Sequence, residues 1–334
     1  MNRISLLYYF TICLQQCYSV CETKTKMHSV QAVTAPVAHA EGPHWVASEH
    51  ALYYVDIYGH GVHRYDIKAN KHTTIKLDDT VGFIIPINNT VGKFVLGLGK
   101  TVTILDWDGI SNNYKLHTKY QVEQDKPGNR FNDAKADING TLWLGTMGRE
   151  EPLGVVENNL GTLYRLLTTD CKLDTVLTPV SISNGITWNA ENTIMYYIDS
   201  VTRRIDAFDF DLRTATIANK RKFFDFEQNN LLGLPDGMTS DTEDNLWIAC
   251  WGGYKVIQVS KEGKLLRSIT LPVARVTSVT WGGSDLNILY VTTMRVGLSV
   301  EELKTQPDAG AVFAITGLGV KGRQGNAVSS CLLD

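Results

Sequence analysis

Short apolar runs recur along the whole chain. Each contains aromatic, β-branched or leucine residues and is too short for a helix, which is typical of a strand. The runs occupy residues 52–56, 94–97, 142–145, 195–199, 246–249 and 289–292. When Tyr53, Val95, Trp143, Tyr196, Trp247 and Tyr290 are aligned, the successive intervals are 42, 48, 53, 51 and 43 residues. A repeat of this length with several strands per unit predicts a β-propeller.

A second strand-like run usually follows each of the first, and turns rich in glycine and asparagine separate them. These second runs occupy residues 61–66, 101–105, 161–165, 204–209, 255–259 and 310–315. No long amphipathic helical pattern is present, and a sandwich or a β-helix would show shorter periods. We therefore expect an all-β fold, a six-bladed β-propeller with four-stranded antiparallel blades. Residues 22–334 would form this single domain, with the ring closed by pairing of the N- and C-terminal strands.

The first 21 residues differ from the repeat. Arg3 precedes an apolar stretch, and no further charge appears before Glu22. This pattern predicts a signal peptide over residues 1–21 and a secreted protein. The alternative is an apolar strand or helix of the mature fold, and an uncleaved leader would leave the protein cytoplasmic. Gln15 and Gln16 interrupt the short stretch, so we expect no membrane anchor in the mature form.

Charge and cysteine content narrow the class of protein further. A formal net charge of −3 and the lack of a Lys/Arg-rich run give no reason to expect a nucleic-acid partner. Outside the leader the cysteines are Cys171, Cys250 and Cys331, an odd number at wide spacings that matches neither a disulfide framework nor a zinc site. We expect a monomer that needs no disulfides. The sequons at Asn88 and Asn139 matter only if the chain is secreted.

A polar side chain precedes four of the six runs at nearly the same spacing. Glu41, Asn132, Asn184 and Asp236 lie 12, 11, 12 and 11 residues before the aligned positions. Pro235-Asp236-Gly237 alone would indicate an ordinary surface turn, but independent turns would not share one phase. The spacing predicts that the four side chains occupy one structural position around the axis, where a propeller binds its ligands.

Glu, Asn and Asp side chains that converge on an axis offer only oxygen ligands. Such a set suits Ca²⁺, Mg²⁺ or Mn²⁺, and Zn²⁺ less well. The alternative is a structural ion without catalysis. Arg130 and Asn132 favour an enzyme, because their side chains can hold an oxygen-rich substrate and a structural ion needs neither.

Several motifs occur in an order that resembles one family. They surround Glu41, Arg130, Glu150, Asn184 and Asp236, and the last ends at Gly322. Together they resemble the regucalcin/SMP-30/gluconolactonase family, including the luciferin-regenerating enzyme of insects, from about residue 41 to residue 322.

The resemblance implies a metal-dependent gluconolactonase. One divalent ion (Ca²⁺, Zn²⁺, Mn²⁺ or Mg²⁺) would be held by Glu41, Asn184 and Asp236, and a small sugar lactone by Arg130, Asn132 and Glu150. The metal would polarise the lactone carbonyl and activate a bound water, with Asp236 as proton acceptor and donor. A calcium-binding or scaffolding propeller, and a related hydrolase acting on a cyclic non-sugar substrate, remain alternatives.

Two other patterns are weaker. Residues 317–322 match the glycine spacing of a dinucleotide-binding fingerprint, but no helix and strand can follow them. His60 and His63 have a spacing that suggests zinc, but we interpret them as part of a solvated turn.

Overall fold

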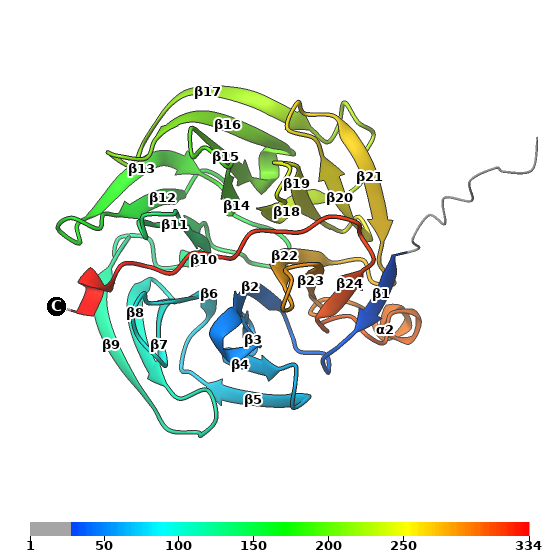
Figure 1. The fold of residues 1–334 in the computed structure, drawn as a ribbon, viewed down its shortest axis with the longest axis horizontal. Helices are drawn as coiled ribbons and strands as arrows, with labels where there is room; N and C mark the ends of the chain where they lie inside the picture. The colour runs from blue at the N-terminus through cyan, green and yellow to red at the C-terminus, as the bar shows by residue number, and fades with distance from the viewer. Residues whose placement is uncertain (1–27, 334) are drawn as a thin grey trace, which may run out of the picture.

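A computed structural model of the protein describes residues 28–333; the predicted signal peptide, residues 1–21, lies outside them. Six four-stranded antiparallel sheets surround a central channel (Figure 1). The predicted six-bladed β-propeller is therefore confirmed. Within the described residues, no helix is long and apolar enough to span a membrane.

Five of the six blades are simple meanders in which the first strand lies nearest the channel. Their strands are β2 (Ala40–Val46), β3 (Ala51–Asp56), β4 (Gly61–Asp66) and β5 (Lys71–Lys76); β6 (Val81–Pro86), β7 (Lys93–Leu98), β8 (Thr101–Trp107) and β9 (Tyr114–Gln121); β10 (Arg130–Ala136), β11 (Leu142–Met147), β12 (Gly161–Leu166) and β13 (Leu173–Val180); β14 (Ser183–Trp188), β15 (Ile194–Asp199), β16 (Arg204–Asp211) and β17 (Thr216–Asp225); and β18 (Leu234–Ser240), β19 (Leu246–Trp251), β20 (Lys255–Val259) and β21 (Leu265–Thr270).

Both ends of the chain build the sixth blade. Its strands are β22 (Val276–Gly282), β23 (Ile288–Thr293), β24 (Phe313–Thr316) and β1 (Ser29–Ala32). β1 pairs antiparallel with β24, so that Ser29 lies opposite Thr316. The N-terminal strand thus closes the ring, as predicted. The short helices are η1 (Ala47–Glu49), η2 (Ser200–Thr202), α2 (Val300–Thr305) and η3 (Ser330–Leu333).

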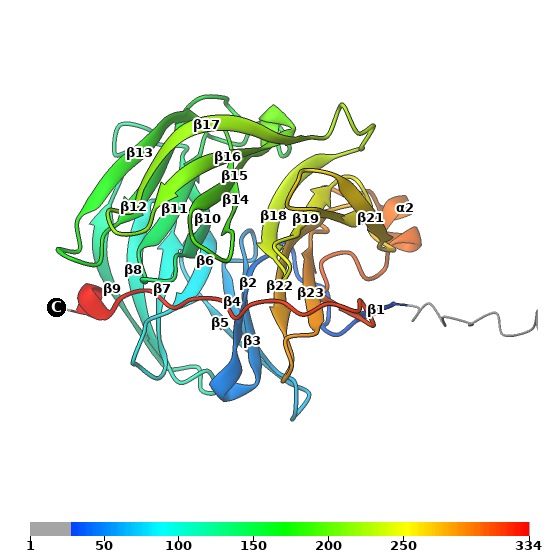
Figure 2. The ribbon, with the colours of Figure 1, turned by 45° about the horizontal axis from the view of Figure 1, so that its top comes forward.

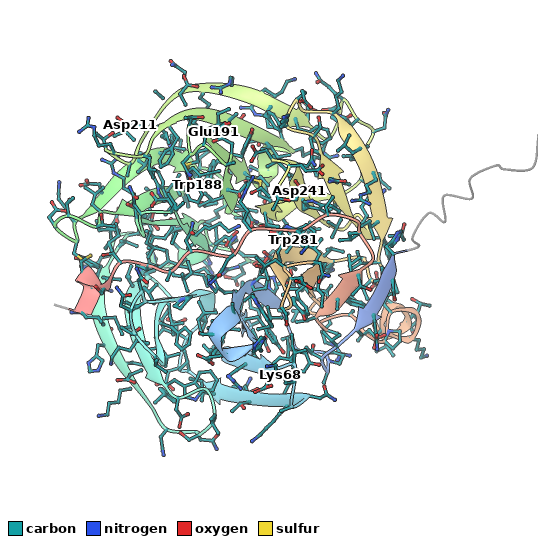
Figure 3. The ribbon with its side chains drawn as sticks, in the orientation of Figure 1. Lys68, Trp188, Glu191, Asp211, Asp241 and Trp281 are labelled. Carbon is teal, nitrogen blue, oxygen red and sulfur yellow. A yellow bond between two sulfur atoms is a disulfide. The ribbon has the colours of Figure 1, made fainter. Side chains whose placement is uncertain are left out.

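The apolar runs seen in the sequence form the cores between neighbouring blades. Trp247 of β19 and Trp281 of β22 meet edge to face with their ring centroids 5.3 Å apart, and both are fully buried. Asp241 accepts a hydrogen bond of 2.9 Å from Trp247 Nε1; Asp241 and Trp281 are labelled in Figure 3. The tryptophan contact holds the inner strand β22 against the neighbouring blade, and the inner strands carry the candidate site.

The chain after β24 forms a C-terminal strap, residues 317–333, that crosses one end of the channel (Figures 1 and 2). Val328 N donates to Pro86 O at 2.9 Å, and Asn326 Nδ2 donates to Ala136 O at 3.2 Å. A cavity of about 250 Å³ lies at this end of the channel and is partly lined by strap residues 323–326.

A disulfide joins Cys331 of the strap to Cys171, with 5.8 Å between the two Cα atoms. The cysteine spacing did not predict this disulfide; whether the fold needs it is tested by removing it. The two cysteines are 160 residues apart in sequence, and only the path of the strap brings them together. Cys250 is buried and unpaired in the described structure.

The interpretation of His60 and His63 as a solvated turn holds for only one of the two residues. His60 lies in a turn, but His63 is a buried residue of β4. The His63 ring stacks on Tyr54 with 4.8 Å between centroids, and its Nδ1 lies 2.9 Å from Thr74 Oγ1. His63 is a packing residue of its blade.

Candidate active site

All six inner strands carry a β-bulge at the same place. In each strand two residues are left out of the pairing with the next strand, and β-bulges of this kind re-aim side chains. The bulged pairs are Gly42 and Pro43, Gly82 and Phe83, Asn132 and Asp133, Asn184 and Gly185, Asp236 and Gly237, and Thr277 and Ser278.

Asn132, Asn184 and Asp236 are each the first residue of a bulged pair, as the sequence spacing predicted. Glu41 differs, because it is the last paired residue before the bulge of β2. The alignment was off by one in this blade: Tyr53 lies opposite the first residue after the bulge, whereas Trp247 lies opposite the second. The longer glutamate side chain still lines the cavity, although Glu41 lies one residue before the position that Asn132, Asn184 and Asp236 occupy.

One cavity of about 90 Å³, at the end of the channel away from the strap, brings the predicted residues together. It is lined by all six, Glu41, Arg130, Asn132, Glu150, Asn184 and Asp236. They come from β2, β10, β14, β18 and the loop after β11. The structure thus assembles the candidate site from four blades.

The two carboxylates in this cavity are almost fully buried, with Glu41 6% and Asp236 7% exposed. Burial, followed by the charges of Asp236 and Asp133, raises the pKa of Glu41 well above its ordinary value. Burial and then Asp133 likewise raise the pKa of Asp236. Buried carboxylates that repel one another are stabilised by a cation between them.

Asn184 provides the third oxygen. Its Nδ2 donates to Ser200 Oγ at 3.0 Å, and Ser200 Oγ donates to Pro235 O at 2.8 Å. This chain fixes the orientation of the amide and leaves Asn184 Oδ1 buried without a hydrogen-bond partner. Buried polar atoms rarely lack a partner, and a hard divalent cation takes amide and carboxylate oxygens. The residues therefore fit such an ion. Within the described residues, no three His, Cys, Asp or Glu side chains cluster so that they could hold a metal. The site formed by Glu41, Asn184 and Asp236 is not such a cluster, because its third donor is an amide.

Arg130 is held on one side of the cavity. Its Nη1 donates to Asn132 Oδ1 at 2.8 Å and to Phe131 O at 3.0 Å, while Asn132 Nδ2 donates to Ser183 O at 2.9 Å. The Asn132 amide is thus engaged at both ends, and it orients the guanidinium. A direct contact of Asn132 with substrate stays a prediction.

Glu150 lies beside the same guanidinium, with its Oε2 4.0 Å from Arg130 Nη2. Its carboxylate accepts hydrogen bonds from Tyr58 OH and, at 2.7 Å, from Gly154 N. Tyr58 was not predicted, because it lies in the β3–β4 loop without any sequence signal.

His39 was also missed as a site residue, although it is only two residues before Glu41. Its ring lies 5.4 Å from that of Tyr58, and its Nδ1 is buried without a partner. Burial, Arg130 and Arg275 lower the pKa of His39 to about 3, so the ring is neutral at physiological pH. Ser200, which orients the Asn184 amide, was missed as well. The remaining missed side chains are apolar and line the same cavity; no chemical motif distinguishes them from core residues.

Residues 39–295 match the family model described as the SMP-30/Gluconolactonase/LRE-like region. The chain belongs to this family. Regucalcin of Xenopus laevis is 38% identical over 283 residues, which cover 84% of this chain and 92% of that protein. Regucalcin of Gallus gallus is 39% identical over the same length and shares.

Two solved structures have a similar fold. A luciferin-regenerating enzyme superposes with a TM-score of 0.86 at 37% identity, covering 91% of this chain and all of that one (100%). A calcium-binding regucalcin of Agrobacterium tumefaciens gives a TM-score of 0.80 at 24% identity, covering 90% and 97%; it supports the fold alone. Family membership supports a lactonase-type or calcium-binding function.

Proposed function

We propose that this protein hydrolyses a small lactone with one divalent cation held by Glu41, Asn184 and Asp236. The observation that carries the proposal is the unpartnered Asn184 Oδ1, fixed by Ser200 in the cavity that also contains two buried carboxylates. Arg130 lines the same cavity and supplies a guanidinium for an oxygen-rich substrate.

The chemistry follows from these side chains. A bound cation would polarise the ester carbonyl and make water more acidic. The Asp236 carboxylate accepts the proton of the attacking water and returns it to the ring oxygen as the C–O bond breaks, so that a hydroxy acid forms. Arg130 donates to the lactone oxygens and stabilises their developing charge. Glu150 holds Arg130 in place.

Calcium binding without catalysis is the second candidate. This candidate is favoured by the similarity to regucalcins, and the calcium ion would bind to the same three oxygen ligands. It gives no role to Arg130 and Glu150, whose side chains meet at 4.0 Å in the same cavity.

One assay distinguishes lactone hydrolysis from calcium binding without catalysis. Chelator-treated protein is resupplied with Ca²⁺, Mg²⁺, Mn²⁺ or Zn²⁺, and proton release is followed on D-glucono-δ-lactone and on unsubstituted δ-valerolactone. We expect hydrolysis to return with a cation. Cation binding in calorimetry without turnover of either lactone would instead support the calcium-binding candidate.

We also propose that the protein is secreted. The Cys171–Cys331 disulfide supports this, because disulfides persist in oxidising compartments and are rare in the cytosol. N-terminal sequencing of the natural protein tests whether residues 1–21 are removed.

Ser200→Ala is expected to weaken cation binding roughly 10- to 100-fold, the usual cost of losing a partner that orients a metal ligand. Without the Ser200 hydroxyl, the Asn184 amide is free to turn its oxygen away. Calorimetric titration with Ca²⁺ measures the effect. Ser240→Ala is the matched control, since Ser240 is also buried, at 6% exposed against 3% for Ser200, but lines the cavity at the strap end. Equal affinities in the two variants would contradict the assigned role.

The buried carboxylates also predict how pH affects the metal-free protein. Folding raises the pKa of Asp236, so the native state binds protons more tightly than the unfolded chain does. The free energy of unfolding therefore falls as pH rises above the ordinary carboxyl range. With chelator present, the melting temperature of the wild type should fall relative to that of Asp236→Asn as pH increases from about 5 to about 8. An unchanged difference between the two melting curves would show that Asp236 does not carry this repulsion.

A further inference from the structure

We propose that the lactone taken by this site carries an apolar substituent, alkyl or aromatic, in place of the hydroxyl groups of a sugar. This inference rests on the proposed lactone hydrolysis and specifies its substrate class. Three observations lead to it: the hydrogen bonds already made in the cavity, the apolar part of its wall, and the exposed apolar residues next to its lining.

The polar groups of the cavity are largely used by the protein itself. Asn132 is bonded at both ends, Glu150 accepts from Tyr58 and Gly154, and Ser200 is engaged with Asn184 and Pro235. Apart from the three proposed cation ligands, His39 Nδ1 is the cavity-lining side-chain atom that is buried without a partner within the described residues. A sugar lactone has several hydroxyl groups, and each needs a partner when it leaves water. Arg130 Nη2 adds a donor, since it lies 4.0 Å from Glu150 Oε2. These few groups do not match the several hydroxyl groups of a sugar.

Apolar side chains form a wall of the cavity beside these polar groups. The wall consists of Met147, Val156, Ile182, Leu234, Trp251 and Met294, and it begins next to the charged pair, because Met147 pairs with Arg130 and Val156 with Glu150. Met147 and Met294 are buried, at 3% and 2% exposed, so they close the inner part of the wall. Apolar and aromatic walls of this kind bind the apolar part of a ligand, while a few polar groups fix its orientation.

Exposed apolar side chains continue this wall out of the cavity. Leu153 and Val155 flank Gly154 in the β11–β12 loop, Val201 follows Ser200, and Leu232 precedes Leu234 by two residues. Their exposed fractions are 39%, 56%, 37% and 72%. Gly154, Ser200 and Leu234 all line the cavity, so the exposed residues are close neighbours of the lining along the chain, and the proposal takes them as the rim of its mouth. A sugar lactone enclosed in the cavity of about 90 Å³ would make no contact with an apolar rim. An apolar substituent that extends out through the mouth would contact it.

The expected preference follows from the chemistry of the contacts. The lactone group lies with its carbonyl toward the carboxylates and Arg130, and the substituent points along the apolar wall to the rim. A methylene buried in an apolar pocket typically raises kcat/KM about tenfold or more. A five-carbon chain that is only partly buried should therefore raise it by at least about tenfold over the bare ring.

The test compares three six-membered lactones with the cation-loaded protein: δ-valerolactone, δ-decalactone and D-glucono-δ-lactone. We expect kcat/KM for δ-decalactone to exceed that for δ-valerolactone by about tenfold or more, and D-glucono-δ-lactone to be the poorest substrate. If D-glucono-δ-lactone equals or exceeds δ-decalactone, the apolar-substituent inference is overturned while lactone hydrolysis stands. If none of the three is hydrolysed, the proposed function fails, and the inference fails with it.

A rim variant tests the location of the substituent. Leu232→Ser should lower the ratio of kcat/KM for δ-decalactone to that for δ-valerolactone several-fold. Val91→Ser is the matched control, because Val91 is 91% exposed and lies in the β6–β7 turn, away from the cavity. The same ratio in both variants would show that the rim does not contact the substituent, and would overturn that part of the proposal. Because both positions are exposed, neither variant is expected to affect folding, which melting curves confirm.

Discussion

Asp236→Asn is expected to lower kcat/KM for lactone hydrolysis by about a thousandfold or more, since the variant loses a proton acceptor and a charged cation ligand together. Asparagine keeps the size of the side chain and removes the buried charge, so the variant should fold. Calorimetry with Ca²⁺ and hydrolysis of δ-valerolactone, measured on the same preparation, report both losses. The structural reason is the position of Asp236 at the β18 bulge, where it faces the cavity shared with Glu41.

The matched control is Asp209→Asn, which removes a carboxylate that is 52% exposed and lies on β16. Its activity and cation affinity should equal those of the wild type. Near-normal turnover by Asp236→Asn, with the cation still bound, would remove Asp236 from the reaction. Lost turnover with unchanged cation affinity would keep Asp236 as the proton acceptor but not as a ligand.

The architecture was accessible from the sequence because it repeats. Each blade buries its second strand, so the apolar runs keep their period. A closed ring also requires its last blade to be completed, which β1 does. The shared phase of Asn132, Asn184 and Asp236 reflects a bulge that all six inner strands carry. Glu41 shows the limit of counting residues: the run that served as reference in its blade is shifted by one, and only the strand register reveals the shift.

The parts that the sequence did not predict depend on contacts between distant segments. Tyr58 reaches Glu150 across 92 residues, and nothing near Tyr58 indicates this. The apolar wall of the cavity is composed like any core strand, so only the surface of the cavity identifies Ile182 or Trp251 as part of a site. The polar side chains of the site could be predicted because the chemistry requires particular residue types; its shape could not.

The disulfide is the second feature that local patterns miss, and its removal should have the largest effect on stability. Cys331→Ser is expected to lower the free energy of unfolding by about 5 kcal/mol, because Cys171 and Cys331 close a loop of about 160 residues in the unfolded chain. For a chain of this size the melting temperature should fall by roughly 10 °C. Differential scanning calorimetry measures the change, and reduction of the wild type should reproduce it.

The same variant tests whether the strap acts on the fold or on the site. Asn326 donates to Ala136 O, at the opposite end of β10 from Arg130, so the strap lies at the far end of the channel from the candidate active site. Well below its melting temperature, Cys331→Ser should therefore keep the lactone hydrolysis and cation affinity of the wild type. Unchanged melting would mean that the hydrogen bonds of the strap suffice without the disulfide. Lost activity in the folded variant would instead show that the two ends of the channel are coupled through the inner strands.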